Sequence, residues 1–191
     1  FYDCNELTTV HLGKNIIKLD SGAFMSCSHL TTINFPERLE EISGNAFDGC
    51  AALTSITLPN SLQTIGSAAF MGCERLASID FGEGVTTIGS SSFEDCVKLK
   101  SITIPDSVTS IGQHAFNSCS NLEEVYVGDG VTSIGYRAFY NCDSLTSILV
   151  EEGNPVYHSA GNCIIETETK TLIAGCKNSV IPTDGSVTSI G

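Results

Sequence analysis

The sequence predicts a solenoid, a stack of similar coils in which each coil contacts only its neighbours. The first observation is a 23-residue period that runs through most of the 191 residues. The second is that apolar residues keep this period without a slip, which places like residues on like when the coils stack. The third is that no repeat has enough apolar residues to bury a core alone. These observations predict about eight coils of 23 residues each.

The period is carried by a leucine, a phenylalanine and a cysteine in each repeat, among other positions. The repeating residues are Leu7, Leu30, Leu53, Leu76, Leu99, Leu122 and Leu145; Phe24, Phe47, Phe70, Phe93, Phe116 and Phe139; and Cys4, Cys27, Cys50, Cys73, Cys96, Cys119 and Cys142. We expect each set to form one continuous buried row through the stack.

Each repeat is expected to contain three short elements. The phrase L-x-x-I-x-L alternates apolar and polar residues, which is typical of a short half-buried strand, and Pro36, Pro59 and Pro105 end it in several repeats. The phrase VTSIG predicts a second short extended piece that a glycine turn closes. The phrase AFxxC is too short for a stable helix, so it predicts a single turn of 3₁₀ or α-helix.

The 23-residue period is interrupted after Val150. The chain there reads GNCIIETETKTLIAGC before SVIPTDGSVTSIG resumes the repeat. Two alternating segments around a polar turn predict a β-hairpin over about residues 161–175. A turn centred on Thr169 and Lys170 would place Cys163 opposite Cys176, whereas a TETK loop would pair Ile165 with Leu172. The second register matches apolar with apolar residues, so we expect free thiols at both cysteines.

The repeat LTSITLPNSLQTIGSAAFMGCER, residues 53–75, resembles the BspA-like leucine-rich repeat, and the likeness covers nearly the whole chain. The resemblance implies a right-handed, curved leucine-rich repeat solenoid with a parallel β-sheet on one face, short strands and single helical turns on the other, and one hairpin insert. It also implies one solenoid domain over residues 1–191. Because both ends fall within a repeat, we expect this domain to be a fragment of a longer chain.

The same resemblance implies a cell-surface or secreted location and an adhesive role. Members of the family are typically large surface or secreted proteins of host-associated anaerobic bacteria and some protists, for which adhesion to host matrix or other cells is the usual proposal. The family has no catalytic residues to carry over, and its motif does not define binding residues.

The cysteine row invites a chemical interpretation. Zinc sites need closely spaced ligand pairs, and the closest two cysteines here, Cys163 and Cys176, are 13 residues apart. Disulfides between coils would need a torsion near 90°, which parallel side chains in register do not give. We therefore expect a row of buried, reduced thiols that act as small apolar groups, with no bound metal and no cofactor.

Charge and motifs argue against several function classes. The net charge of −13 repels nucleic acid and anionic membrane surfaces, and no apolar run approaches the roughly 18–20 residues of a membrane span. The four histidines, His11, His29, His114 and His158, fall at unlike positions of the repeat. No nucleophile, nucleotide or metalloprotease motif accompanies them, so we expect no enzyme activity.

Exposed positions on the strands are the better candidates for binding. One outward row is formed by His11, Asn34, Thr57, Asp80, Thr103, Tyr126 and Leu149, about 4.8 Å apart. Near its end, Tyr126 and Leu149 replace small polar groups, with Glu124 in the adjoining row, and exposed aromatics favour interfaces. Tyr136, Arg137 and Tyr140 form a second candidate cluster, although surface aromatics need no function.

Two functions remain open at this stage. The first is a non-enzymatic binding or adhesion module that presents its solenoid face to a protein or glycan on a host or neighbouring cell. The second is a structural spacer or stalk that displays another domain and has no ligand of its own. We expect a monomer, although exposed end coils could associate end to end.

Overall fold

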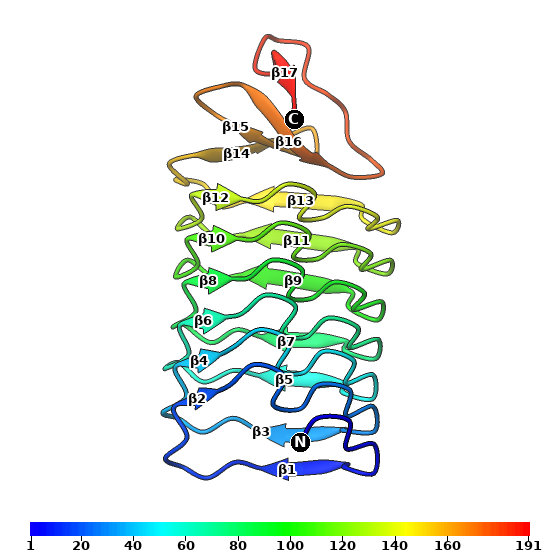
Figure 1. Ribbon diagram of the computed structural model, residues 1–191. Coiled ribbons are helices and arrows are strands. Elements are labelled where there is room, and N and C mark those ends of the chain that lie inside the picture. The colour runs from blue at the N-terminus through cyan, green and yellow to red at the C-terminus, as the bar shows by residue number, and fades with distance from the viewer.

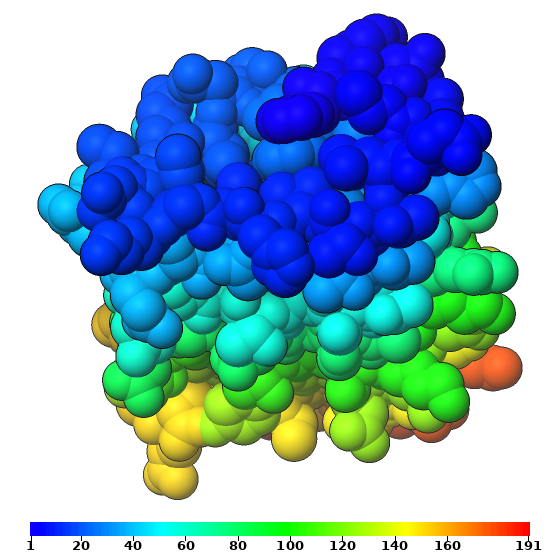
Figure 2. All heavy atoms as spheres, turned by 90° about the horizontal axis from the view of Figure 1, so that it is seen from below, coloured from blue at the N-terminus to red at the C-terminus, as the bar shows by residue number.

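The computed structural model describes residues 1–191 and confirms the solenoid. The chain climbs through stacked coils, with the N-terminus near one end and the C-terminus at the other (Figure 1). Figure 2 views the stack from its N-terminal end, where the first coils lie in front of the later ones. The structure contains no helix that could span a membrane.

One face of the stack is built from the L-x-x-I-x-L strands. Equivalent strands pair in parallel and in the predicted register, with Val10 opposite Ile33 and Val125 opposite Ile148. The strands are β1 (Thr9–His11), β3 (Thr32–Asn34), β5 (Ser55–Thr57), β7 (Ser78–Asp80), β9 (Ser101–Ile104), β11 (Glu124–Val127) and β13 (Ser147–Val150). Stacking of identical repeats therefore sets the register, as the 23-residue period predicts.

A second face consists of two-residue strands from the VTSIG phrases. They form one six-stranded parallel sheet of β2 (Lys18–Leu19), β4 (Glu41–Ile42), β6 (Thr64–Ile65), β8 (Thr87–Ile88), β10 (Ser110–Ile111) and β12 (Ser133–Ile134). The solenoid thus has about six regular turns rather than the eight predicted. The count differs because the chain leaves the regular path after β13, and the resumed VTSIG phrase pairs in a separate sheet.

The AFxxC segments are not helical turns, and this part of the prediction was wrong. Phe70 N–H donates to Ser92 O of the next coil at 2.8 Å, while Ala69 and Met71 donate back to Gly66 O and Ala68 O. Alternate N–H groups therefore point along the stack, whereas a helix would keep them within the segment. Ala68 and Gly72 have φ of 54° and 67°, in the left-handed region, which also excludes a helix.

The core is one cluster of 41 buried residues that extends from Leu19 to Ile164. The repeated phenylalanines stack face to face through it, with ring centroids 5.3 Å apart for Phe24 and Phe47 and 5.0 Å for Phe47 and Phe70. The cysteines do more than fill space. Cys73 Sγ donates to Phe47 O at 3.4 Å, and the other thiols of the row from Cys27 to Cys142 bond the preceding coil in the same way.

The first face is interrupted at two places, between β3 and β5 and between β7 and β9. Each break follows a coil with phenylalanine at the third inward position, Phe35 or Phe81, where the other paired coils have leucine, isoleucine or valine. These rings pack edge-on against Phe47 at 5.8 Å and Phe93 at 5.7 Å. We attribute the breaks to their width, because paired strands lie only about 4.8 Å apart.

The predicted hairpin is confirmed. β15 (Cys163–Glu166) and β16 (Thr171–Gly175) are antiparallel, and Ile165 lies opposite Leu172, as the TETK loop requires. Cys163 consequently faces Gly175 rather than Cys176, and both thiols are free. The sequence did not predict β14 (Tyr157–Ala160), which pairs antiparallel with β15, or that β17 (Ser189–Ile190) would pair with β16.

Candidate functional site

The first candidate surface is the C-terminal end of the L-x-x-I-x-L face. Tyr126 and Leu149 are register partners on β11 and β13, and Glu124 lies opposite Ser147. Leu149 is 50% exposed and Tyr126 is half-buried. The structure therefore brings Tyr126 and Leu149 together as neighbouring outward side chains, with the exposed Glu124 carboxylate on the same strand.

A hollow of about 560 Å³ adjoins Tyr126. Its walls carry the carboxyl groups of Glu83, Asp106 and Glu151, together with Thr103 and Ser107. The hollow lies beside the break between β7 and β9, because Glu83 follows β7 and Thr103 lies on β9. Three carboxylates beside an aromatic ring suit a basic or hydroxyl-rich partner.

The first break, between β3 and β5, opens a larger groove of about 810 Å³. Asn34, Asn60, Asp80 and Glu83 line it, and few of its other side chains are apolar. Thr54 N–H has no acceptor here, whereas the equivalent Ala77 N–H donates to Thr54 O at 2.9 Å. Sequence reasoning missed this groove, although the phenylalanine at position 35 was the signal for it.

Tyr136, Arg137 and Tyr140 form a compact second cluster on the turn that follows β12. The Arg137 guanidinium lies 4.9 Å from the Tyr136 ring centroid and 4.5 Å from that of Tyr140. Both tyrosines are exposed, and no carboxylate pairs with Arg137. Cation–π contact with two rings holds the guanidinium in place while its N–H groups stay available.

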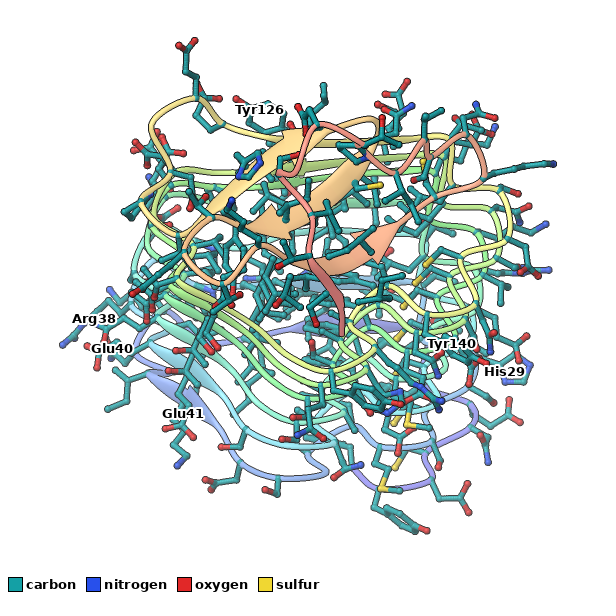
Figure 3. The ribbon with its side chains drawn as sticks, turned by 90° about the horizontal axis from the view of Figure 1, so that it is seen from above. His29, Arg38, Glu40, Glu41, Tyr126 and Tyr140 are labelled. Atoms are coloured by element: carbon teal, nitrogen blue, oxygen red, sulfur yellow. The ribbon has the colours of Figure 1, made fainter.

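The two candidate surfaces are separate. Figure 3, which looks down the stack, places Tyr126 and Tyr140 on different sides of the molecule. Beside Tyr140 is a mainly apolar hollow of about 500 Å³, whose opposite wall is formed by Ile173, Ala174 and Gly175 at the end of β16. No feature of the sequence pattern predicts that the hairpin leaves this space open.

Most thiols of the cysteine row have raised pKa values, as expected of buried side chains with a structural role. Burial raises the pKa of the thiols of Cys50 and Cys142 to about 12, and it raises those of Cys73, Cys96 and Cys119 well above their usual value. A thiol must ionise to act as a nucleophile or a metal ligand. The row is therefore unsuited to either chemistry at neutral pH, and no group of three or more potential ligands is arranged to hold a metal.

The histidines are dispersed, as their sequence positions predict. His158 Nδ1 lies 2.9 Å from Thr167 Oγ1, and His29 Nδ1 lies 3.3 Å from Ser28 Oγ. His114 contacts the edge of Tyr136 with ring centroids 6.1 Å apart. None of them pairs with a carboxylate, so the structure contains no nucleophile, histidine and acid in series.

Stacked repeats, parallel strands and a continuous phenylalanine row define a leucine-rich repeat solenoid. A family model for the BspA type leucine rich repeat region matches residues 1–59 and 40–160 in six copies. The chain belongs to this family, whose solenoids are typically non-catalytic. Among curated protein sequences, no similar relative was found.

Solved structures agree with this assignment. A leucine rich repeat protein of T. pallidum is 33% identical with a TM-score of 0.71, over 76% of this chain and 68% of that one. A leucine rich cell surface protein from Faecalibacterium prausnitzii is 25% identical with a TM-score of 0.67, over 100% of this chain and 52% of that one. The pneumococcal vaccine antigen PcpA shares the fold, with a TM-score of 0.60 at 23% identity, over 96% of this chain and 41% of that one. The chain thus spans about half or less of the last two.

Proposed function

We propose that this chain is a non-enzymatic binding or adhesion module, displayed at a cell surface or secreted, that contacts a protein or glycan on a host or neighbouring cell. The observation that carries the proposal is a contrast along the stack. Buried positions repeat the same residue from coil to coil, whereas the outward row changes from His11 through Thr57 to Tyr126 and Leu149. A scaffold with a constant interior and varied exterior is suited to presenting a specific surface.

Tyr126 and Leu149 are the proposed centre of the contact. Aromatic anchors contribute disproportionately to binding when polar groups surround them. Here Glu124 lies on the same strand, and the carboxylates of Glu83, Asp106 and Glu151 line the neighbouring hollow. We propose that the partner presents basic or hydroxyl groups to these carboxylates and an apolar group to the ring. The description of the Faecalibacterium prausnitzii relative as a cell surface protein supports the proposed location.

The experiment is adsorption of the purified chain to an immobilised extracellular matrix preparation. Wild type should bind saturably, and replacement of Tyr126 and Leu149 by serine should weaken binding by about tenfold or more. A control variant with Thr32 and Thr57 replaced by serine, on the same exposed face, should bind like wild type. Equal binding by all three proteins would refute the surface, and saturable binding by none would favour a spacer without a ligand.

A further inference from the structure

The hollow beside Tyr140 exists because one coil is cut short. Regular coils run nine residues from the isoleucine of the second face to the cysteine, as from Ile134 to Cys142. Gly191 N–H bonds to Leu172 O as Gly135 N–H bonds to Ile111 O, so Leu172 has the same place under Ile190 that the isoleucine of a regular coil has under the next one. From Leu172 the chain reaches Cys176 in five residues. This shorter turn leaves the segment from Tyr136 to Asn141 without the coil that would stack on it.

The uncovered segment has unpaired hydrogen-bond donors. One coil below, the N–H groups of His114, Phe116 and Ser118 donate to Tyr136 O, Ala138 O and Tyr140 O at 3.1, 2.8 and 2.9 Å. The equivalent N–H groups of the uncovered segment belong to Arg137, Phe139 and Asn141, and none of them has an acceptor.

The direction of these donors follows from the backbone. Arg137 and Asn141 have φ of 55° and 57°, nearly the same as the 56° and 59° of His114 and Ser118. Their N–H groups consequently point toward the next level of the stack, where the hollow of about 500 Å³ lies. The donors face the space that a following coil occupies elsewhere in the molecule.

We propose that this hollow binds a segment of a partner polypeptide as an added rung, with an acidic side chain of that segment on Arg137. The coils below show what kind of group the three N–H donors bind. Their counterparts in those coils all donate to alternate carbonyl oxygens of a polypeptide. Main-chain pairing of this kind is how proteins extend an open edge. Specificity comes from the Arg137 guanidinium, which has no carboxylate of its own, and from the apolar wall of Ile173 and Ala174.

This inference deepens the proposed function, because it gives the partner's chemistry at a second surface, and it rests on the chain being a binding module. The probe is an acetylated and amidated peptide with the sequence of residues 88–97 and its cysteine replaced by serine. In its own coil this segment offers Ser90 O, Ser92 O and Glu94 O to the N–H groups of Ala68, Phe70 and Gly72. The peptide keeps two carboxylates, those of Glu94 and Asp95, and a control peptide carries glutamine and asparagine instead.

The test titrates each peptide into the ¹⁵N-labelled chain. We expect the amide resonances of Arg137, Phe139 and Asn141 to shift saturably, and the acidic peptide to bind about tenfold more tightly than the neutral one. The variant Arg137→Gln should abolish that preference, while Arg75→Gln, an exposed arginine on a lower coil, should preserve it.

Three results would overturn the proposal: absence of saturable shifts at these amides, equal affinity for the two peptides, or protection of the three amides from hydrogen exchange without peptide. The last would mean that another part of the same polypeptide fills the hollow. Matrix adsorption by the Arg137→Gln variant separates this inference from the proposed function. If this variant still adsorbs to the matrix while neither peptide binds the wild-type chain, the added rung is wrong and the proposed function stands.

Discussion

Truncation of one phenylalanine in the buried row should be among the most damaging single changes. Phe70 is fully buried, and its ring stacks between Phe47 at 5.0 Å and Phe93 at 5.4 Å. Replacement of a buried phenylalanine by alanine costs about 3–5 kcal/mol, the sum of lost transfer free energy and the cavity left behind. Hydrogen bonds from Phe47 N–H to Ala69 O at 2.7 Å and from Phe70 N–H to Ser92 O at 2.8 Å fix the spacing between the coils. These bonds restrict relaxation of the backbone into the cavity, so we expect the upper half of that range.

The assay is equilibrium urea denaturation of wild type, Phe70→Ala and Phe1→Ala. Phe1 belongs to the same row and its ring stacks on that of Phe24, but Phe1 is 73% exposed, so its replacement by alanine should cost less than about 1 kcal/mol. Hydrogen exchange should locate the loss of protection in the coils next to Phe70. A free energy of unfolding that falls by less than about 1 kcal/mol for Phe70→Ala, or by the same amount in both variants, would contradict a core in which the stacked phenylalanine rings stabilise neighbouring coils.

Three further changes test separate features of the fold. Gly112→Ala should destabilise strongly because an added Cβ would clash with the backbone nitrogen of Ser90, whereas Gly13→Ala should be tolerated because nothing lies within 4 Å of its added Cβ; thermal melting compares the two variants. Raised thiol pKa values mean that the unfolded chain loses protons first, so stability should fall from about pH 9 toward pH 12, as denaturation at graded pH would reveal. Phe81→Val should let β7 and β9 pair, giving the Lys100 amide slower hydrogen exchange; an unchanged rate would mean that another feature holds the break open.

The sequence predicted those features that depend on repetition. When identical repeats stack, the period alone determines which residues are neighbours, so the pairing of Tyr126 with Leu149 needed no further information. The hairpin register followed from matching Ile165 with Leu172, because only that choice pairs apolar side chains.

Features that depend on competition between coils were not predictable in the same way. The N–H groups of AFxxC could bond within a helical turn or with carbonyl groups of the next coil. The bond from Phe70 N–H to Ser92 O shows that they bond with the next coil. The breaks at Phe35 and Phe81 depend on ring orientation, and the hollow beside Tyr140 depends on where the chain re-enters the stack after β15. Each is a long-range outcome that a repeat pattern does not contain.

The most direct measurement of the central claim is the affinity of the chain for an isolated matrix component, compared across three proteins by biolayer interferometry. If the varied end of the exposed row is the binding surface, replacing Tyr126 and Leu149 by serine should raise Kd by about tenfold or more, while the Thr32 and Thr57 control keeps the wild-type value. An unchanged Kd in the first variant, with its folded content intact by circular dichroism, would contradict the account.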